Sequence, residues 1–175
     1  MTLCACPRVQ EHLLVDIRPK NNIYRFYDVD QDHPPEQPNA CILFDYWIKK
    51  RGARAYPSWK DIDLLDIWQI ASCLIVKDVI NDGADFLNRY WGTMLTQKAG
   101  FEGTGRTHLD LYKDHPEGPQ LNTYQAVVNS RKPNRIYRTS SFITGREFVA
   151  FHSLNLPLGM TDEHVDHILI VIDYE

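Results

Sequence analysis

Residues 73–91, CLIVKDVINDGADFLNRYW, contain two runs of strand-forming residues joined by a turn, and they decide which kind of sheet the chain can form. The first run, CLIVKDV, is rich in branched apolar residues, and the second, FLNRYW, adds aromatic ones. Between them, Asn81-Asp82-Gly83 supplies residues that tolerate positive φ in a tight connection. Because strands joined by a tight turn pair antiparallel, we expect a hairpin within an antiparallel sheet.

The rest of the chain adds helical segments and three further strands. Apolar residues recur with helical spacing at residues 40–51, 57–68, 93–99, 107–112 and 119–130. Strands are expected at residues 134–143, 147–158 and 165–174, besides the hairpin strands at 73–79 and 85–91. The tight Thr144-Gly145 turn again requires antiparallel pairing. The predicted fold class is therefore α/β of the α+β kind.

Residues 1–38 are less regular and are interpreted as an N-terminal extension, with the domain at 39–175. Within the extension, LLVDI and NIYRFYDV have the composition of short strands, and DQDHPPEQP is a polar, proline-rich break. We expect the domain itself to include the helix that begins near Ala40. In that helix Tyr46 and Trp47 lie on the apolar side.

Composition and charge exclude several classes of protein. A chain of 175 residues with 43% hydrophobic residues is most simply one domain. Its net charge of -4 and the absence of any basic run longer than Lys49-Lys50-Arg51 disfavour nucleic acid as a partner. Its apolar runs are too short to span a membrane, and no secretion signal is visible. Four cysteines without disulfide or metal spacing fit a cytoplasmic protein.

The stretch GFEGTGRT, residues 100–107, resembles the phosphate-binding pattern G-x-x-x-x-G-K-[ST], with Arg106 in place of lysine. A small nucleotide-binding protein is therefore the alternative function, with Asp173 after ILIVI as a candidate for holding magnesium. That motif requires a buried strand before it and a helix of a parallel α/β unit after it. LTQKA, residues 95–99, is no buried strand, so the context disfavours this alternative.

The same region carries a resemblance to a known family. From about Cys41 to Tyr174 the chain resembles a PAS domain of the group catalogued as PAS family 5, found in proteobacteria. The resemblance rests on YW-x(3)-RG from Tyr46, P-S-x(3)-I-D from Pro57, R-x-x-G-T from Arg89, TGR from Thr104 and LPL from Leu156. Leu64 departs from the family, which more often has proline after I-D, and residues 1–38 match no known pattern.

The resemblance implies a five-stranded antiparallel sheet with helices over one face, here preceded by an N-terminal helix and the extension. It also implies a sensory or interaction module in bacterial signal transduction, with no catalytic residues. Its partners would be a small-molecule ligand and a signalling protein such as a histidine kinase, or a second copy in a homodimer. We expect the chain to have no output domain of its own. Tyr46 and Trp47 are the predicted dimer or partner surface.

Strand alternation suggests where a ligand would lie. On REFVAFHSLNLPL, residues 146–158, the apolar-rich set contains Phe148, His152 and Leu154, and we interpret it as facing inward, toward the space where a ligand would lie. His152 then needs a polar partner, for which Tyr112, Tyr124 or a ligand are candidates. The predicted ligand pocket comprises Tyr112, Tyr124, Val127, Phe148, His152 and Leu154.

The identity of any cofactor stays unknown from the sequence. Haem would need an axial histidine, but His108 and His115 stand beside Asp110 and Asp114 and are read as solvated. No segment resembles the N-C-R-F-L-Q of flavin-binding photoreceptors. The histidines of HVDH, residues 164–167, point to opposite sides of an extended segment, so no metal site is predicted.

Overall fold

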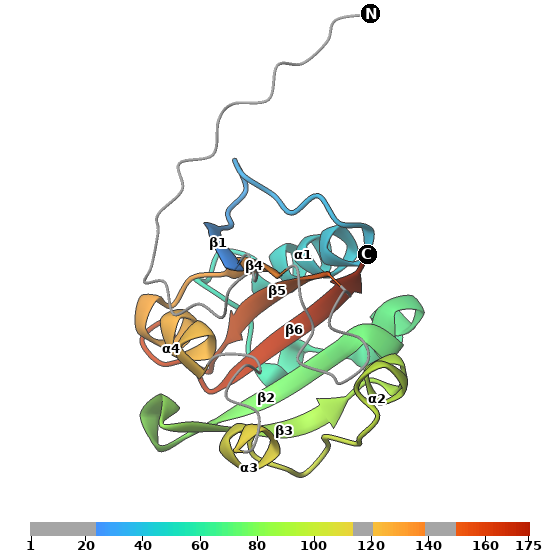
Figure 1. Cartoon of the computed structure of the whole chain (residues 1–175). Coiled ribbons are helices and arrows are strands. Elements are labelled where there is room, and N and C mark those ends of the chain that lie inside the picture. The colour runs from blue at the N-terminus through green and yellow to red at the C-terminus, as the bar shows by residue number, and fades with distance from the viewer. Residues whose placement is uncertain (1–23, 114–120, 139–149) are drawn as a thin grey trace, which may run out of the picture.

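The computed structural model describes residues 24–113, 121–138 and 150–175. Within these ranges the strands form one antiparallel sheet of six strands in the order β1-β4-β5-β6-β2-β3 (Figure 1). The predicted α+β class and antiparallel pairing are confirmed. In this part of the chain, no helix has the length and apolar character needed to span a bilayer.

The hairpin predicted from residues 73–91 is present. Strand β2, Leu74–Ile80, and strand β3, Asp85–Trp91, pair antiparallel with a bulge after Val76. In the connection Asn81, Asp82 and Gly83 have φ angles of 49°, 54° and 90°, the left-handed values that the asparagine, aspartate and glycine predicted. The turn residues therefore fix the local chain reversal.

Three later strands complete the family's five-stranded core. They are β4, Asn134–Arg138, β5, Phe151–Leu158, and β6, His167–Tyr174. Strand β6 lies between β5 and β2, and its residues Ile168–Val171 are fully buried because the sheet is covered on both sides. The outer parts of two predicted strands, residues 139–143 and 147–149, lie outside the described residues.

A sixth strand comes from the predicted N-terminal extension. Strand β1, Tyr24–Asp28, pairs antiparallel with β4 at the edge of the sheet. It lies within NIYRFYDV, the segment whose composition indicated a short strand. The sheet therefore has one strand more than the five that the family resemblance implied.

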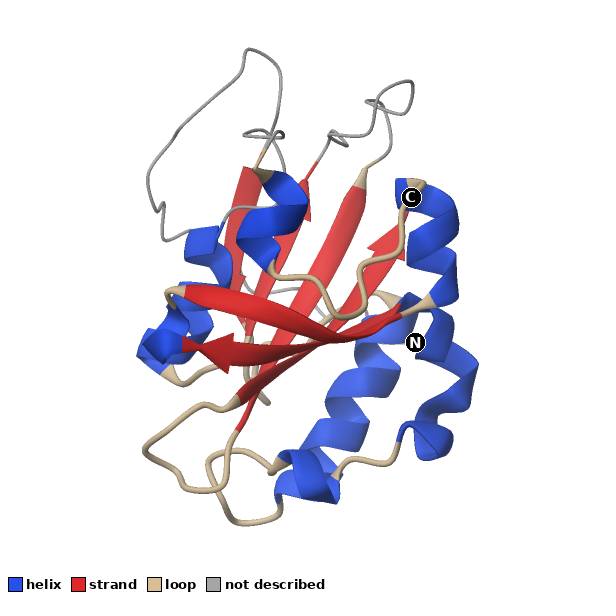
Figure 2. Ribbon diagram, turned by 90° about the horizontal axis from the view of Figure 1, so that it is seen from below, coloured by secondary structure: helices blue, strands red, loops and turns tan. Residues whose placement is uncertain are grey.

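The two faces of the sheet are covered by different helices (Figures 1 and 2). We call the face covered by α1, Pro38–Arg51, and by the 3-10 segment η2, Leu64–Cys73, the outer face. The opposite, inner face is covered by α3, His108–Tyr112, and α4, Leu121–Ser130. Helix α2, Thr93–Ala99, lies at the end of β3 on the inner side. Side chains facing either layer are thus removed from water.

The motifs that carried the family resemblance hold the outer face together. Trp47 of α1 is 2% exposed, and its Nε1 donates to the carbonyl of Pro157, 2.9 Å away, so the YW and LPL motifs meet. The Tyr46 hydroxyl donates to the carbonyl of Asp63 and accepts from its amide at 2.8 Å. Asp63 in turn caps η2 by accepting from the amide of Leu65. These motif residues therefore have a structural role.

The stretch GFEGTGRT joins α2 to α3 along the edge of β3. The amide of Gly105 donates to the carbonyl of Asn88, and the amide of Asn88 donates to the carbonyl of Arg106. The Arg106 guanidinium pairs with Asp110 at 3.0 Å. A Cβ on Gly103 would lie 2.6 Å from the Trp91 ring, so close packing requires glycine there. The stretch has neither the preceding buried strand nor the long following helix of a phosphate-binding loop.

Candidate ligand site

The inner face of the sheet carries an apolar floor interrupted by polar side chains. One cross-strand row contains Trp91, Ile75, Ile170, Asn155 and Asn134, each directly opposite the next. Paired strands lie about 4.8 Å apart, so five strands place the ends of this row roughly 19 Å from each other. Buried isoleucines with a few polar groups among them are typical of the lining of small-molecule sites.

Lys77 lies in the adjacent row of the inner face, between Asn88 and Ile168. Its side chain is 1% exposed, and Nζ donates to Asn88 Oδ1 at 2.6 Å. The same nitrogen lies 4.8 Å from the ring centroid of Tyr124 on α4. Burial lowers the pKa of Lys77 from 10.5 to about 7, against the opposing effect of Asp85. Near neutral pH this amine therefore exists in both protonation states.

Aromatic rings form a continuous series above this floor. His108 of α3 is 3% exposed, and its ring lies 4.8 Å from that of Tyr112 and 5.3 Å from that of Tyr124. Tyr112 also contacts Phe101, which lies 5.7 Å from Trp91. Because the series joins α3 and α4 to β3, any displacement of either helix changes the packing over Lys77.

The buried polar atoms without a hydrogen-bond partner among the described residues include one donor and one acceptor of the inner face. They are Trp91 Nε1 and Asn155 Oδ1, on side chains that are 8% and 0% exposed. The amide nitrogen of Asn155 is used, since it donates to Asn134 Oδ1 at 2.7 Å. A buried polar atom without a partner costs about 1 to 3 kcal/mol, so this donor and this acceptor favour a polar molecule against the face.

The far end of the inner face carries Arg138, which is 5% exposed at the end of β4. Tyr112 lies close enough to interact electrostatically with Arg138 and Tyr124. Burial raises the pKa of Tyr112 well above its ordinary value of 10.0, with Arg138 acting in the opposite direction. The phenol therefore keeps its proton at neutral pH and can donate a hydrogen bond.

Of the six residues predicted to line one pocket, the five that the structure describes do not share one face of the sheet. Tyr124 and Val127 are buried on the sheet-facing side of α4, and Tyr112 belongs to the inner aromatic series. His152 and Leu154 lie on the outer face, and Phe148 lies outside the described residues.

The placement of His152 follows from its strand partners. It is opposite Asp173, whose carboxylate accepts hydrogen bonds from the first amides of α1. Its Nε2 lies 3.1 Å from Glu175 Oε1, and its ring stacks on Tyr137. The expectation that the apolar-rich set of β5 faces inward was wrong, because Ser153 and Asn155 face α4 and the apolar set packs under α1.

Sequence reasoning also missed residues of the inner face. Lys77 interrupts the apolar run of β2, and a charged residue inside such a run was the available signal. Asn88 and Asn155 occupy strand positions where asparagine is disfavoured. His108 was read as solvated from its acidic neighbours, but it is buried because Thr107 caps α3 and turns the histidine toward the sheet.

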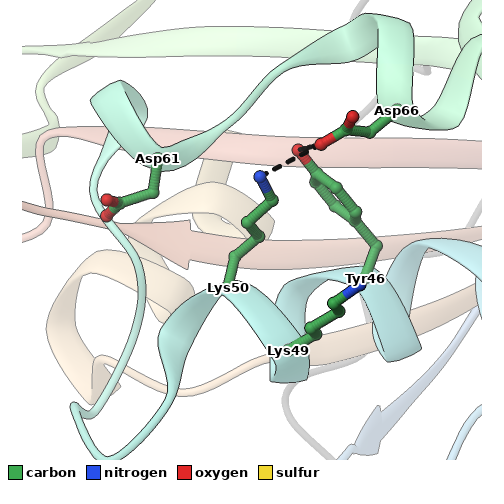
Figure 3. A pocket seen from close by; sticks show the side chains of 5 residues that line it. All are labelled: Tyr46, Lys49, Lys50, Asp61 and Asp66. Carbon is green, nitrogen blue, oxygen red and sulfur yellow. Dashed lines mark hydrogen bonds and ion pairs between the residues drawn. The ribbon is translucent and has the colours of Figure 1, made fainter.

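The predicted partner surface, Tyr46 and Trp47, is buried within the chain, with Tyr46 against Asp63 and Trp47 against Pro157 of β5. Beside Tyr46 an open hollow of about 620 Å³ lies between α1 and the segment that contains Asp61 and Asp66 (Figure 3). Lys50 Nζ bridges to Asp66 at 3.0 Å inside it. Because these charges compensate each other, the hollow attracts a charged ligand only weakly.

No group of three or more histidine, cysteine or acidic side chains within the described ranges is arranged to hold a metal ion. The acidic residues near η2 have structural partners. Asp61 accepts from Ser58 and pairs with Arg54, and Asp63 caps η2. The inner face thus offers hydrogen-bonding and aromatic groups to an organic molecule.

An antiparallel sheet with short helices over a partly polar inner face defines a small α+β domain suited to binding. A family model described as a PAS domain matches residues 36–172 of this chain. The chain belongs to the PAS domain family, as the sequence motifs indicated, and is thereby a sensory or interaction module in general terms. Searches of curated proteins and of solved structures returned no match.

Proposed function

We propose that this protein is a cytoplasmic sensory module that binds a small molecule on the inner face, between the sheet and helices α3 and α4. Binding changes the positions of these helices, and a signalling protein such as a histidine kinase, or a second copy of the chain, receives the change. The observation that carries the proposal is a pair of buried polar atoms in one cross-strand row, Trp91 Nε1 and Asn155 Oδ1, which have no partner in the described part of the chain.

The arrangement of α3 supports a link between ligand and surface. The amide of Leu109 donates to Asp85 Oδ1 at 3.1 Å, which ties α3 to the start of β3. Leu109 itself is 52% exposed, while His108 on the same helix turns inward. A ligand that moves His108 therefore also moves residues that a partner can contact.

Native mass spectrometry of the freshly purified protein, followed by a thermal-shift screen of metabolites, tests this proposal. A ligand at a hundredfold excess over Kd stabilises the folded state by about 2.7 kcal/mol. For a domain of this size that corresponds to roughly 5 to 10 °C in Tm. Trp91→Phe removes one unpartnered donor and should weaken the response.

Two matched controls locate the site. Trp59→Phe changes a tryptophan that stacks on His167 away from the inner face, and His152→Ala changes the histidine of the outer face. Both variants should keep the ligand response. Loss of the response in these controls but not in Trp91→Phe would contradict the proposed location, and the absence of any retained or stabilising molecule would contradict small-molecule sensing.

A second candidate function is protein binding through η2. Leu65 and Trp68 are 77% and 73% exposed. Between them η2 is interrupted at Ile67, whose φ of -127° and ψ of 32° are not helical, so each exposed side chain belongs to its own short turn. Exposed tryptophan is frequent at the centre of protein interfaces. Sedimentation of the wild type and of Trp68→Ser over a range of concentrations tests for a homodimer through this surface, and monomeric wild type at all concentrations would argue against it.

A further inference from the structure

The inner face places a buried amine next to an apolar and aromatic surface. Among the described residues, Lys77 Nζ has one hydrogen bond, to the neutral amide oxygen of Asn88, although an ammonium group carries three donor hydrogens. Nζ also lies over the face of Tyr124. No aspartate or glutamate is among the buried residues of the described ranges, whereas Lys77, His108 and Arg138 are. The described interior therefore has more groups that can be positively charged than groups that can be negative.

The neighbours of Lys77 come from three elements. Asp85 on β3 acts on it electrostatically, Tyr124 projects from α4, and His108 of α3 contacts Tyr124. Asp85 is itself engaged, since its carboxylate accepts from the amides of Phe86 and Leu109. None of these groups gives Lys77 a direct carboxylate partner.

We infer that the ligand of the inner face is a small carboxylic acid with an aromatic or apolar body, whose carboxylate accepts a hydrogen bond from Lys77 Nζ. This inference rests on the proposed function and specifies its ligand class. The carboxylate supplies the missing opposite charge to the amine, and the body lies against isoleucines of the sheet and the rings of α3 and α4. Charge-assisted hydrogen bonds of this kind are about twice as strong as neutral ones.

Phosphorylated ligands fit this face less well. A phosphate group needs several donors, commonly backbone amides of a glycine-rich loop. In the only glycine-rich stretch of the chain the amide of Gly105 is bonded to Asn88, and Arg106 is paired with Asp110. One ammonium beside a neutral amide matches the single charge of a carboxylate.

Because Lys77 titrates near neutral pH, the affinity for a carboxylic acid should depend on pH. Without ligand, burial holds the pKa of Lys77 at about 7, and a bound carboxylate raises it because opposite charges favour the ionised form. Only the protonated amine pairs with the acid, so affinity falls as pH rises above 7. Between pH 6.5 and 8.5 the acid should bind about 25-fold more weakly, by proton linkage at a single site.

The test compares acids with their uncharged amides by isothermal titration calorimetry on the full chain. Benzoate, phenylacetate and hexanoate are the acid probes, and benzamide, phenylacetamide and hexanamide are matched in shape without the charge. We expect at least one acid to bind about tenfold or more tightly than its amide, and to lose affinity with rising pH as stated. Lys77→Met should remove both the preference and the pH dependence, whereas Lys132→Met, an exposed lysine, should change neither.

The outcomes separate the inference from the proposed function. A pH dependence that persists in Lys77→Met would come from His108 or another group and would overturn the role of Lys77. Amides that bind as tightly as acids, or a retained ligand without a carboxylate, would overturn the ligand class and leave small-molecule sensing intact. If no probe binds and the purified protein retains no molecule, both fail. The comparison of acid with amide uses the wild-type protein, so it does not depend on the folding of any variant.

Discussion

Trp47 and Trp68 provide a direct comparison of a buried and an exposed tryptophan in the same layer. Trp47 is 2% exposed, stacks on Phe44 with ring centroids 6.1 Å apart, and donates to the carbonyl of Pro157. Trp68 is 73% exposed. Replacing each by alanine removes the same side chain, so the difference between the two variants measures what burial and the hydrogen bond contribute.

We expect Trp47→Ala to lower the free energy of unfolding by about 3 to 5 kcal/mol, the usual cost of truncating a buried tryptophan. The carbonyl of Pro157 also loses its donor, which places the value toward the upper end of this range. Trp68→Ala should stay within about 0.5 kcal/mol of the wild type, as surface changes usually do. Trp47→Phe keeps a ring but not the donor, so its loss in free energy of unfolding should lie between those of Trp47→Ala and Trp68→Ala.

Urea unfolding followed by far-ultraviolet circular dichroism measures these differences without relying on tryptophan fluorescence. In a thermal melt the Trp47→Ala loss corresponds to roughly 6 to 20 °C in Tm for a domain of this size. Equal midpoints for Trp47→Ala and Trp68→Ala would refute the packing of α1 on the outer face. If Trp47→Ala does not fold, Trp47→Phe still reports the hydrogen bond.

Three further predictions concern stability. The folded pKa of Lys77, about 7, lies below 10.5, so the unfolded chain binds more protons between these values and stability rises with pH across this window. Relative to Lys77→Met, the free energy of unfolding of the wild type, measured with urea, should rise by about 2 kcal/mol from pH 7 to 9. If the two proteins show the same dependence of stability on pH, the burial of this amine is contradicted. Gly92→Ala places a Cβ 2.2 Å from the carbonyl oxygen of Ser72, so we expect the folded state to be less stable by about 1 to 3 kcal/mol. Thermal melts measure this change, and an unchanged Tm would refute the close approach. Tyr46→Phe removes the hydroxyl that bonds both backbone groups of Asp63 and should lower the free energy of unfolding by about 1 to 3 kcal/mol. A variant as stable as the wild type would show that water replaces the hydroxyl.

The hairpin could be predicted because its signals are local. Branched residues define the strands of 73–91, and Asn81-Asp82-Gly83 can adopt positive φ at small cost, so neither depends on distant parts of the chain. The family motifs were equally readable. In the structure Trp47 bonds to Pro157 and Tyr46 bonds to Asp63, so the motif residues meet on the outer face.

The composition of the site could not be predicted in the same way. Alternation on β5 separates two sets of side chains but does not say which set faces which helices, since both faces of this sheet are buried. The rule that the apolar set faces the core therefore selected His152 and Leu154, whereas the inner face holds Ser153 and Asn155. Long-range pairing was needed to place Lys77 beside Tyr124.

By itself, the sequence determined the class of the fold, the antiparallel hairpin and the family, because turn conformation and strand propensity act over a few neighbouring residues. Only the tertiary structure decided that α1 covers one face and α3 with α4 the other, and that Lys77, Asn155 and Trp91 share the inner one. The reason is physical: which side of a strand becomes the site depends on which helices pack there, and that choice is set by contacts between residues far apart in the chain.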